Sequence, residues 1–224
     1  MNKEFYRNLC EITDSENVRL DEPMKFHTTF RIGGKASYFV TPGTKEEIKK
    51  IIRLCRDYHI DYFILGNGSN LLVSDNGYDG VIIQIYKNLN RICAEDTVIT
   101  AMSGAMLGRV AKEAADLSLT GLEFASGIPG TLGGAIVMNA GAYGGEMKDV
   151  VTEVTVLDAA GNEKKISGKD MGFRYRTSII AVSYTHLDVY KRQLLPCFSI
   201  LPDPALDSLS GDIRRRLPPD VLFP

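Results

Sequence analysis

A short glycine-rich loop, GNGSN at residues 66–70, has the residue types that can surround a phosphate. Successive backbone N–H groups in a tight turn form a concave anion site, and glycine allows a close approach. Ser69 and Asn70 add donors with little bulk. The loop lacks the lysine-serine/threonine ending of a Walker loop, and no helical pattern follows it as the GxGxxG fingerprint requires. It is therefore either an ordinary tight turn or a phosphate cradle.

A second stretch, GLEFASGIPGTLGGAIVMNAGAYGG at 121–145, holds eight glycines and one charged residue, Glu123. Such a segment packs against protein, for example in a close helix-to-loop contact, or it lines an apolar ligand. A flat aromatic cofactor laid on backbone satisfies the same pattern. If 66–70 held a pyrophosphate and 121–145 a ring system, the two would together hold a flavin dinucleotide.

Two further side chains could act on a substrate. Arg176, in FRYRTS at 173–178, presents a rigid fork suited to a carboxylate or enolate. Its spacing alone favours a surface arginine at a strand end. Tyr143 is either a core or lid aromatic, or a residue that faces a ligand.

The elements that must position these loops follow from local patterns. We expect a strand at 36–41 and then a helix that begins at the capping box Thr44–Glu47. We expect the apolar positions of this helix to share one buried face: Ile48, Ile51, Ile52, Cys55 and Tyr58. Strand-like runs follow at 62–65, 71–74 and 81–85, which completes a small βαβ unit with further strands.

A second unit begins near residue 91. We expect a strand at 97–102, a helix at 105–117, a strand at 150–157, a hairpin turn at 159–164 and a last strand at 173–180. The buried face of the helix is expected to carry Leu107, Val110, Ala111 and Ala114. The sequence thus predicts an α+β protein in which two halves, 1–88 and 89–181, meet at the glycine-rich loops.

Composition excludes several functional classes. The 224 residues carry a formal net charge of −2, which favours neither nucleic acid nor an anionic membrane as a partner. Four scattered cysteines indicate neither a disulfide framework nor a metal site. We expect a soluble cytoplasmic protein, since no apolar run is long enough to span a membrane and no signal peptide is apparent.

The segment 182–224 differs in composition, with six of the nine prolines and one of the 21 glycines. It shows no sustained period of 2 or 3.6. The run SYTHLDVYKRQ at 183–193 resembles adapter read-through in assembled sequence. We interpret 182–224 as a tail foreign to the rest, artefactual or disordered; the alternative is a genuine divergent C-terminus.

Four motifs, in order, carry a family resemblance: HTTFRIGGKASYF at 27–39, ILGNGSNLLVSDNGYDGVII at 64–83, the stretch from Gly121 to Val150, and FRYRTS at 173–178. Together they closely resemble the UDP-N-acetylenolpyruvoylglucosamine reductases over about residues 5 to 180. The resemblance implies the FAD-binding fold of the vanillyl-alcohol oxidase and p-cresol methylhydroxylase type. In that fold two α+β subdomains bind an extended FAD, and a third domain, expected to be missing here, covers the substrate.

The resemblance also implies site residues. Arg176 matches the catalytic arginine that faces the substrate carboxylate, and Tyr143 matches a tyrosine of the substrate channel. The residues implied to bind the cofactor are Gly66, Asn67, Gly68, Ser69, Asn70, Leu71, Gly130, Thr131, Gly133, Gly134, Asn139, Gly141 and Ala142. No metal is implied.

The implied reaction transfers a hydride from NADPH to FAD and then to the enolpyruvyl ether of a UDP-sugar, giving UDP-N-acetylmuramate, a peptidoglycan precursor. The family's proton-donating serine and its late glutamate have no counterpart in this sequence. We therefore expect a monomeric fragment that binds FAD without turnover. Two other functions stay open: another oxidase of the same fold, and a non-catalytic flavin-binding module.

Overall fold

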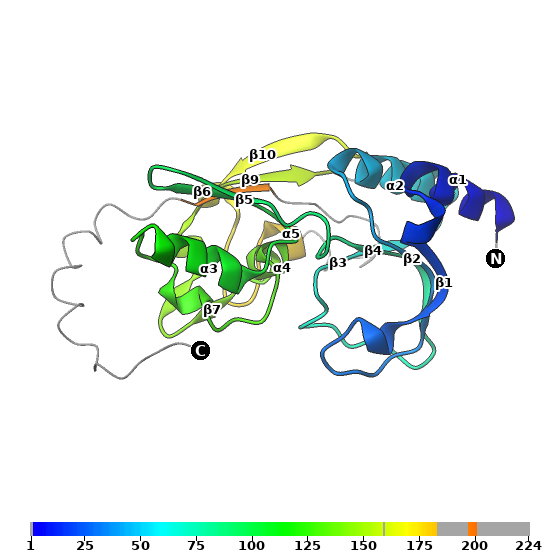
Figure 1. Ribbon diagram of the computed structural model, residues 1–224, viewed down its shortest axis with the longest axis horizontal. Helices are drawn as coiled ribbons and strands as arrows, with labels where there is room; N and C mark the ends of the chain where they lie inside the picture. The colour runs from blue at the N-terminus through cyan, green and yellow to red at the C-terminus, as the bar shows by residue number, and fades with distance from the viewer. Residues whose placement is uncertain (1, 159, 183–196, 201–224) are drawn as a thin grey trace.

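The computed structural model describes residues 2–158, 160–182 and 197–200. In this part the chain forms two main β-sheets that lie side by side, each packed against helices (Figure 1). The first sheet is built from residues before 85 and the second from residues after 91. The predicted boundary at 88/89 falls between the two sheets; the division into independent domains stays a prediction.

The first sheet has four strands in the order β1-β2-β4-β3. These are β1 (Val18–Pro23), β2 (Lys35–Val40), β3 (Tyr62–Leu65) and β4 (Tyr78–Gln84). Strands β2, β3 and β4 are parallel, whereas β1 runs antiparallel to β2. Helices α1 (Lys3–Thr13) and α2 (Lys45–Asp57) pack together above this sheet (Figure 1). The parallel unit β2-α2-β3 confirms the predicted βαβ pattern; α1 and β1 were not predicted.

Helix α2 begins where its capping pattern predicts. The Thr44 side chain accepts a hydrogen bond from the Glu47 backbone N–H at 3.2 Å, and the Glu47 carboxylate accepts one from the Gly43 N–H at 2.8 Å. The first bond satisfies a donor that the first helical turn leaves unpaired, and the second ties the Glu47 carboxylate to the residue before the N-cap. The helix buries its predicted apolar face against the sheet, with Tyr58 only half-buried because it lies at the C-cap. The fully buried members are Ile48, Ile51, Ile52 and Cys55.

The second sheet has the order β10-β9-β11-β6-β5, and every adjacent pair is antiparallel. Its strands are β5 (Ile92–Glu95), β6 (Val98–Met102), β9 (Val151–Leu157), β10 (Glu163–Ser167) and β11 (Cys197–Ile200). Strand β11 is the described part of the predicted tail beyond Val182. The remainder of that tail lies outside the described residues, and its interpretation stays a prediction.

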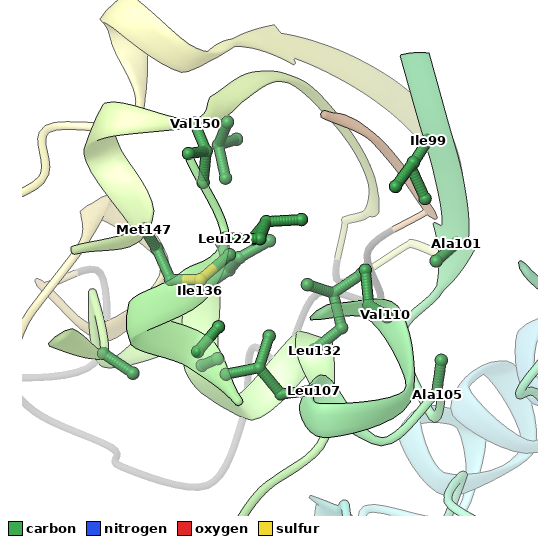
Figure 2. Close-up of a cluster of buried hydrophobic side chains, with 14 of the residues drawn as sticks. Ile99, Ala101, Ala105, Leu107, Val110, Leu122, Leu132, Ile136, Met147 and Val150 are labelled. Atoms are coloured by element: carbon green, nitrogen blue, oxygen red, sulfur yellow. The ribbon is translucent and has the colours of Figure 1, made fainter. Parts of the chain in front are cut away.

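The core of the second half lies between this sheet and the helices α3 (Leu107–Asp116) and α4 (Leu132–Val137). Figure 2 shows side chains from both helices and from β6 converging on one another. The predicted face of α3 is buried as expected. A small hairpin of β7 (Gly141–Ala142) and β8 (Gly145–Glu146) follows α4.

Two predicted strands were wrong. Residues 71–74 form no strand, because the chain there crosses over the loop at Gly33 and Gly34, and the Gly34 N–H donates to the Ser74 carbonyl at 2.9 Å. Residues 173–180 form a tight turn closed by the pair Arg174 and Thr177, followed by the short helix α5 (Ile179–Val182). The left-handed backbone of Arg176, with φ of 54°, is incompatible with an extended strand.

The hairpin between β9 and β10 reaches from the second sheet to helix α2 (Figure 1). The Glu163 carboxylate forms ion pairs with Lys49 at 2.7 Å and Lys45 at 2.9 Å, and Arg53 donates to the Ala160 carbonyl at 3.4 Å. Leu157, at the end of β9, is buried in the same apolar cluster as the inner face of α2. The β9–β10 hairpin thus joins the two halves at helix α2, through an apolar contact at Leu157 and ion pairs at Glu163.

The ion pairs of Glu163 predict a pH-dependent contribution to stability. Hydrogen bonds from Lys49 and then Lys45 lower the pKa of Glu163 from its ordinary 4.5 to about 2. A carboxyl group whose pKa is lower in the folded than in the unfolded protein stabilises the fold at any pH above its unfolded pKa. This stabilisation is lost as the pH falls from about 4.5 to about 2. We expect Glu163→Gln to destabilise the protein by about 1 kcal/mol or less at pH 7, since the site is partly exposed.

Urea unfolding of both proteins between pH 7 and pH 2.5 measures this difference, which should shrink through the acid range. Glu16→Gln is the control, because Glu16 is exposed and makes no ion pair with the described residues. An equal loss for Glu163→Gln at every pH would contradict the electrostatic explanation.

Candidate functional site

A cavity of about 710 Å³ lies between the two halves and brings the two glycine-rich stretches together. Residues 63–71 form one wall, from the end of β3 into the GNGSN loop. Most of the residues between Ile128 and Ala140 form the other wall, although Asn139 is not among them, and Ile85, Arg176 and Ile180 complete the lining. Of the predicted site residues, the cavity lining contains Gly66, Asn67, Gly68, Ser69, Asn70, Leu71, Gly130, Thr131, Gly133, Gly134 and Arg176.

Glycine is required at two positions of the first wall. A Cβ atom at Gly66 would overlap the hydroxyl of Thr131 on the opposite wall. Gly68 has φ of +72°, and a Cβ there would overlap the carbonyl oxygen of His27. The loop is therefore pressed between residue 27 and the second wall, and neither position has room for a side chain. This close packing fixes the direction of the backbone between Gly66 and Asn70.

The same loop presents unused hydrogen-bond donors. Within the described residues, the backbone N–H groups of Asn67, Gly68, Ser69 and Asn70 have no acceptor in the protein. The loop does accept one bond, from the Thr29 N–H to the Gly68 carbonyl at 3.1 Å, which holds it to the first half. Consecutive free donors beside a cavity are suited to an anion such as a diphosphate.

The second wall is held by the rest of the second half. The Thr131 side chain caps α4 by accepting from the Gly134 N–H at 3.4 Å. The N–H groups of Leu132 and Gly133 donate to the carbonyls of Ala105 and Ser103 at 2.8 and 2.9 Å. This wall therefore offers little free polar backbone at its start and mainly apolar surface beyond, which suits a flat ring more than a phosphate.

Arg176 reaches the cavity because of a strained turn. Its left-handed φ of 54° is uncommon for a residue other than glycine, and it lies in the turn closed by two backbone bonds between Arg174 and Thr177, at 3.0 and 3.2 Å. The following Ser178 is fully buried, and its hydroxyl donates to the Val137 carbonyl at 3.0 Å. Arg176 is the only charged residue among the described residues that line the cavity.

Four predicted site residues lie outside this lining. Asn139 is 2% exposed, and its side chain is used inside the protein: it donates to Glu146 and to the Arg174 carbonyl and accepts from the Lys148 N–H. Gly141 and Ala142 form β7, and Tyr143 is the 98% exposed tip of its hairpin. Their contacts with a ligand stay predictions.

Sequence reasoning missed most of the apolar lining. These residues come from β3, the end of β4, helix α4 with its flanking loops, and α5, where an apolar side chain predicts only burial. The signal that could have found some of them is their position directly before or after the glycine loops. The missed residues are Phe63, Ile64, Leu65, Ile85, Ile128, Pro129, Ala135, Val137, Met138, Ala140 and Ile180.

The cavity fits the groups of a flavin dinucleotide. It has the volume typical of small-molecule and cofactor sites. The free N–H groups of the first wall match a pyrophosphate, and the apolar second wall matches an aromatic ring. Among the described residues, no cluster of His, Cys, Asp and Glu could hold a metal ion, and none of the helices is long and apolar enough to cross a membrane.

Comparisons with known proteins agree with this geometry. A family model described as an FAD-binding domain matches residues 36–167. The UDP-N-acetylenolpyruvoylglucosamine reductase of Clostridioides difficile is 49% identical over 180 residues, which is 80% of this chain and 59% of that protein. The reductase of Geobacillus thermodenitrificans is 48% identical over 182 residues, again 59% of its length. The chain thus spans somewhat less than 60% of these curated relatives.

Solved structures show the same fold. The crystal structure of UDP-N-acetylenolpyruvylglucosamine reductase (MurB) from Thermus caldophilus matches with a TM-score of 0.64 and 31% identity, over 90% of this chain and 70% of that one. p-Cresol methylhydroxylase matches with a TM-score of 0.63 at 16% identity, over 90% of this chain and 43% of that one, which shows the shared fold alone. The expected α+β fold of this type is confirmed. The chain belongs to the UDP-N-acetylenolpyruvoylglucosamine reductase family and carries its FAD-binding domain.

Proposed function

We propose that this chain is the FAD-binding part of an NADPH-dependent reductase that converts UDP-N-acetylenolpyruvoylglucosamine to UDP-N-acetylmuramate in peptidoglycan synthesis. We also propose that the protein is a monomer in the cytoplasm. The observation that carries it is the cavity in which free backbone donors, an apolar wall and one guanidinium face the same space.

The chain's own residues would divide the work of holding the cofactor. The N–H groups of Asn67 to Asn70 would bind the pyrophosphate, and the wall that includes Gly133 and Gly134 would lie along the flavin ring. When bound, FAD would supply the hydride chemistry that no side chain can supply. The apolar residues of both walls would keep water away from the ring.

Arg176 would hold the substrate. Reduction of an enolpyruvyl group moves negative charge onto its carboxylate, and a fixed guanidinium stabilises that charge without reorganising. The strained turn would place the Arg176 guanidinium at the cavity before the substrate binds. We also propose, from the family resemblance, that these 224 residues alone bind FAD without turnover.

Titration of the purified chain with FAD tests the cofactor. We expect quenching of flavin fluorescence and a rise in the unfolding temperature that grows with FAD concentration. A chain that is colourless once free FAD has been removed after incubation with saturating FAD, with neither change, would contradict the proposal. FAD binding that is never followed by NADPH oxidation in any longer relative would favour the non-catalytic module.

The role of Arg176 can be measured on the FAD-loaded chain. We expect the UDP-enolpyruvyl substrate to shift the flavin absorbance spectrum, and Arg176→Gln to weaken this binding by about 10- to 100-fold, the effect of one lost charged hydrogen bond. Arg174→Gln is the matched control, because Arg174 is exposed and does not line the cavity. Equal affinities of the two variants would argue against a substrate contact at Arg176.

A further inference from the structure

A second cavity, of about 610 Å³, lies away from the glycine-rich loops. It is also formed by both halves: residues 43–45 at the start of α2 contribute one side, and residues 88–92 with Met102 and Arg109 contribute the other. The FAD-binding cavity and this one share no lining residue. Nothing in the proposed reaction uses it.

The charge of this cavity is one-sided. Its lining includes Lys45, Arg91 and Arg109, and no acidic residue lines it among the residues that the structure describes. Lys45 is paired with Glu163, whereas Arg91 and Arg109 form no ion pair within the described part of the chain. Both arginines are exposed, so their charge faces the open space.

The polar groups around the arginines are held in place. The Asn88 amide donates to the carbonyls of Thr41 and Pro42 at 3.1 and 3.2 Å, which ties the 88–92 segment to the loop that follows β2. The Arg91 carbonyl accepts from the Met102 N–H at 2.9 Å. The backbone that carries Arg91 is therefore fixed relative to both halves. Arg109 lies in helix α3, so both arginines extend from a backbone that is held in place.

We propose that this second cavity binds a small molecule with two or more negative charges, such as a diphosphate. Two unpaired guanidinium groups that line one cavity raise the local positive potential, and a multivalent anion relieves it while accepting forked hydrogen bonds from both. The cavity is large enough for such a ligand, and its lining, within the described residues, carries no carboxylate that would compete for the two arginines.

The test is calorimetric titration of the 224-residue chain with inorganic pyrophosphate, in buffer free of divalent cations. The FAD loop could itself bind pyrophosphate, so each titration is run with and without saturating FAD. The double variant R91Q/R109Q removes the proposed contacts. The double variant R7Q/K50Q removes the same charge from exposed positions outside the cavity.

We expect R91Q/R109Q to weaken pyrophosphate binding at least 10-fold in the presence of FAD, and R7Q/K50Q to change it less than twofold. The binding should weaken as salt increases. Equal loss in the two doubles, or binding that disappears from the native chain once FAD is added, would overturn the proposal. The test does not require that FAD binds, because the affinities of the two double variants for pyrophosphate are also compared in the absence of FAD.

Discussion

Replacement of Gly68 by alanine is expected to destabilise the fold by about 2–4 kcal/mol and to weaken FAD binding by at least 100-fold. A residue with a side chain at φ of +72° costs about 1–2 kcal/mol, and overpacking adds a similar amount. The new Cβ would overlap the backbone oxygen of His27, which cannot rotate away as a side chain can. The loop must therefore shift, and the N–H groups of Asn67 to Asn70 would shift with it.

Urea unfolding and fluorescence titration with FAD measure the two effects separately. Gly127→Ala is the matched control in the second glycine-rich stretch, because no atom lies within 4 Å of a Cβ there and its φ is not left-handed. We expect Gly127→Ala to change both quantities little. Native FAD affinity in Gly68→Ala would show that the loop donors do not bind the cofactor.

The second large effect is expected at Asn139. Its buried amide links three segments: β8 through Glu146, the turn before Arg176 through the Arg174 carbonyl at 3.1 Å, and the Lys148 N–H at 3.0 Å. Its φ of 41° also lies in the left-handed region, which asparagine tolerates better than alanine. We expect Asn139→Ala to destabilise the protein by about 2–4 kcal/mol, since it removes three hydrogen bonds of a buried amide and adds strain at a left-handed φ.

Asn8→Ala provides the comparison, because it removes a single side-chain bond, to the Tyr58 hydroxyl at 3.1 Å, from a partly buried site. That change should cost about 1 kcal/mol or less. If urea unfolding gave the same loss for both variants, the structural role of Asn139 would be wrong. A loss of FAD affinity in Asn139→Ala larger than its destabilisation explains would instead support the predicted cofactor contact.

Local patterns determined much of the fold in advance. Helix α2 follows from Thr44, Glu47 and a buried face of period 3.6, all of which act within a few residues of one another. Helix α3, strands β2, β3, β6 and β9, and the hairpin at Gly161 follow for the same reason. The four motifs, taken in their order, also indicated the family. A match of long sequence segments to a family can be recognised without knowing which residues contact one another in the fold.

The site itself was only partly predictable. The sequence indicated that 66–70 and 121–145 would meet, but the apolar lining from Phe63 to Leu65 looked like any buried strand. The last predicted strand was wrong because the chain forms a turn at Arg176 instead. The residues of this turn show only a weak local preference for it in the sequence. The left-handed φ of Arg176 is sustained by the burial of Ser178 and by the bond to Val137.

By itself, then, the sequence determined helices α2 and α3, several of the strands, which loops are rich in glycine, and which family the chain belongs to. Only the tertiary structure decided that Asn139 is a buried link, that Tyr143 is exposed, and that the β9–β10 hairpin reaches α2. The physical reason is that burial and hydrogen-bond pairing depend on residues far apart in the chain. A glycine or an asparagine has the same local preferences wherever it lies, and its partners decide which role it takes.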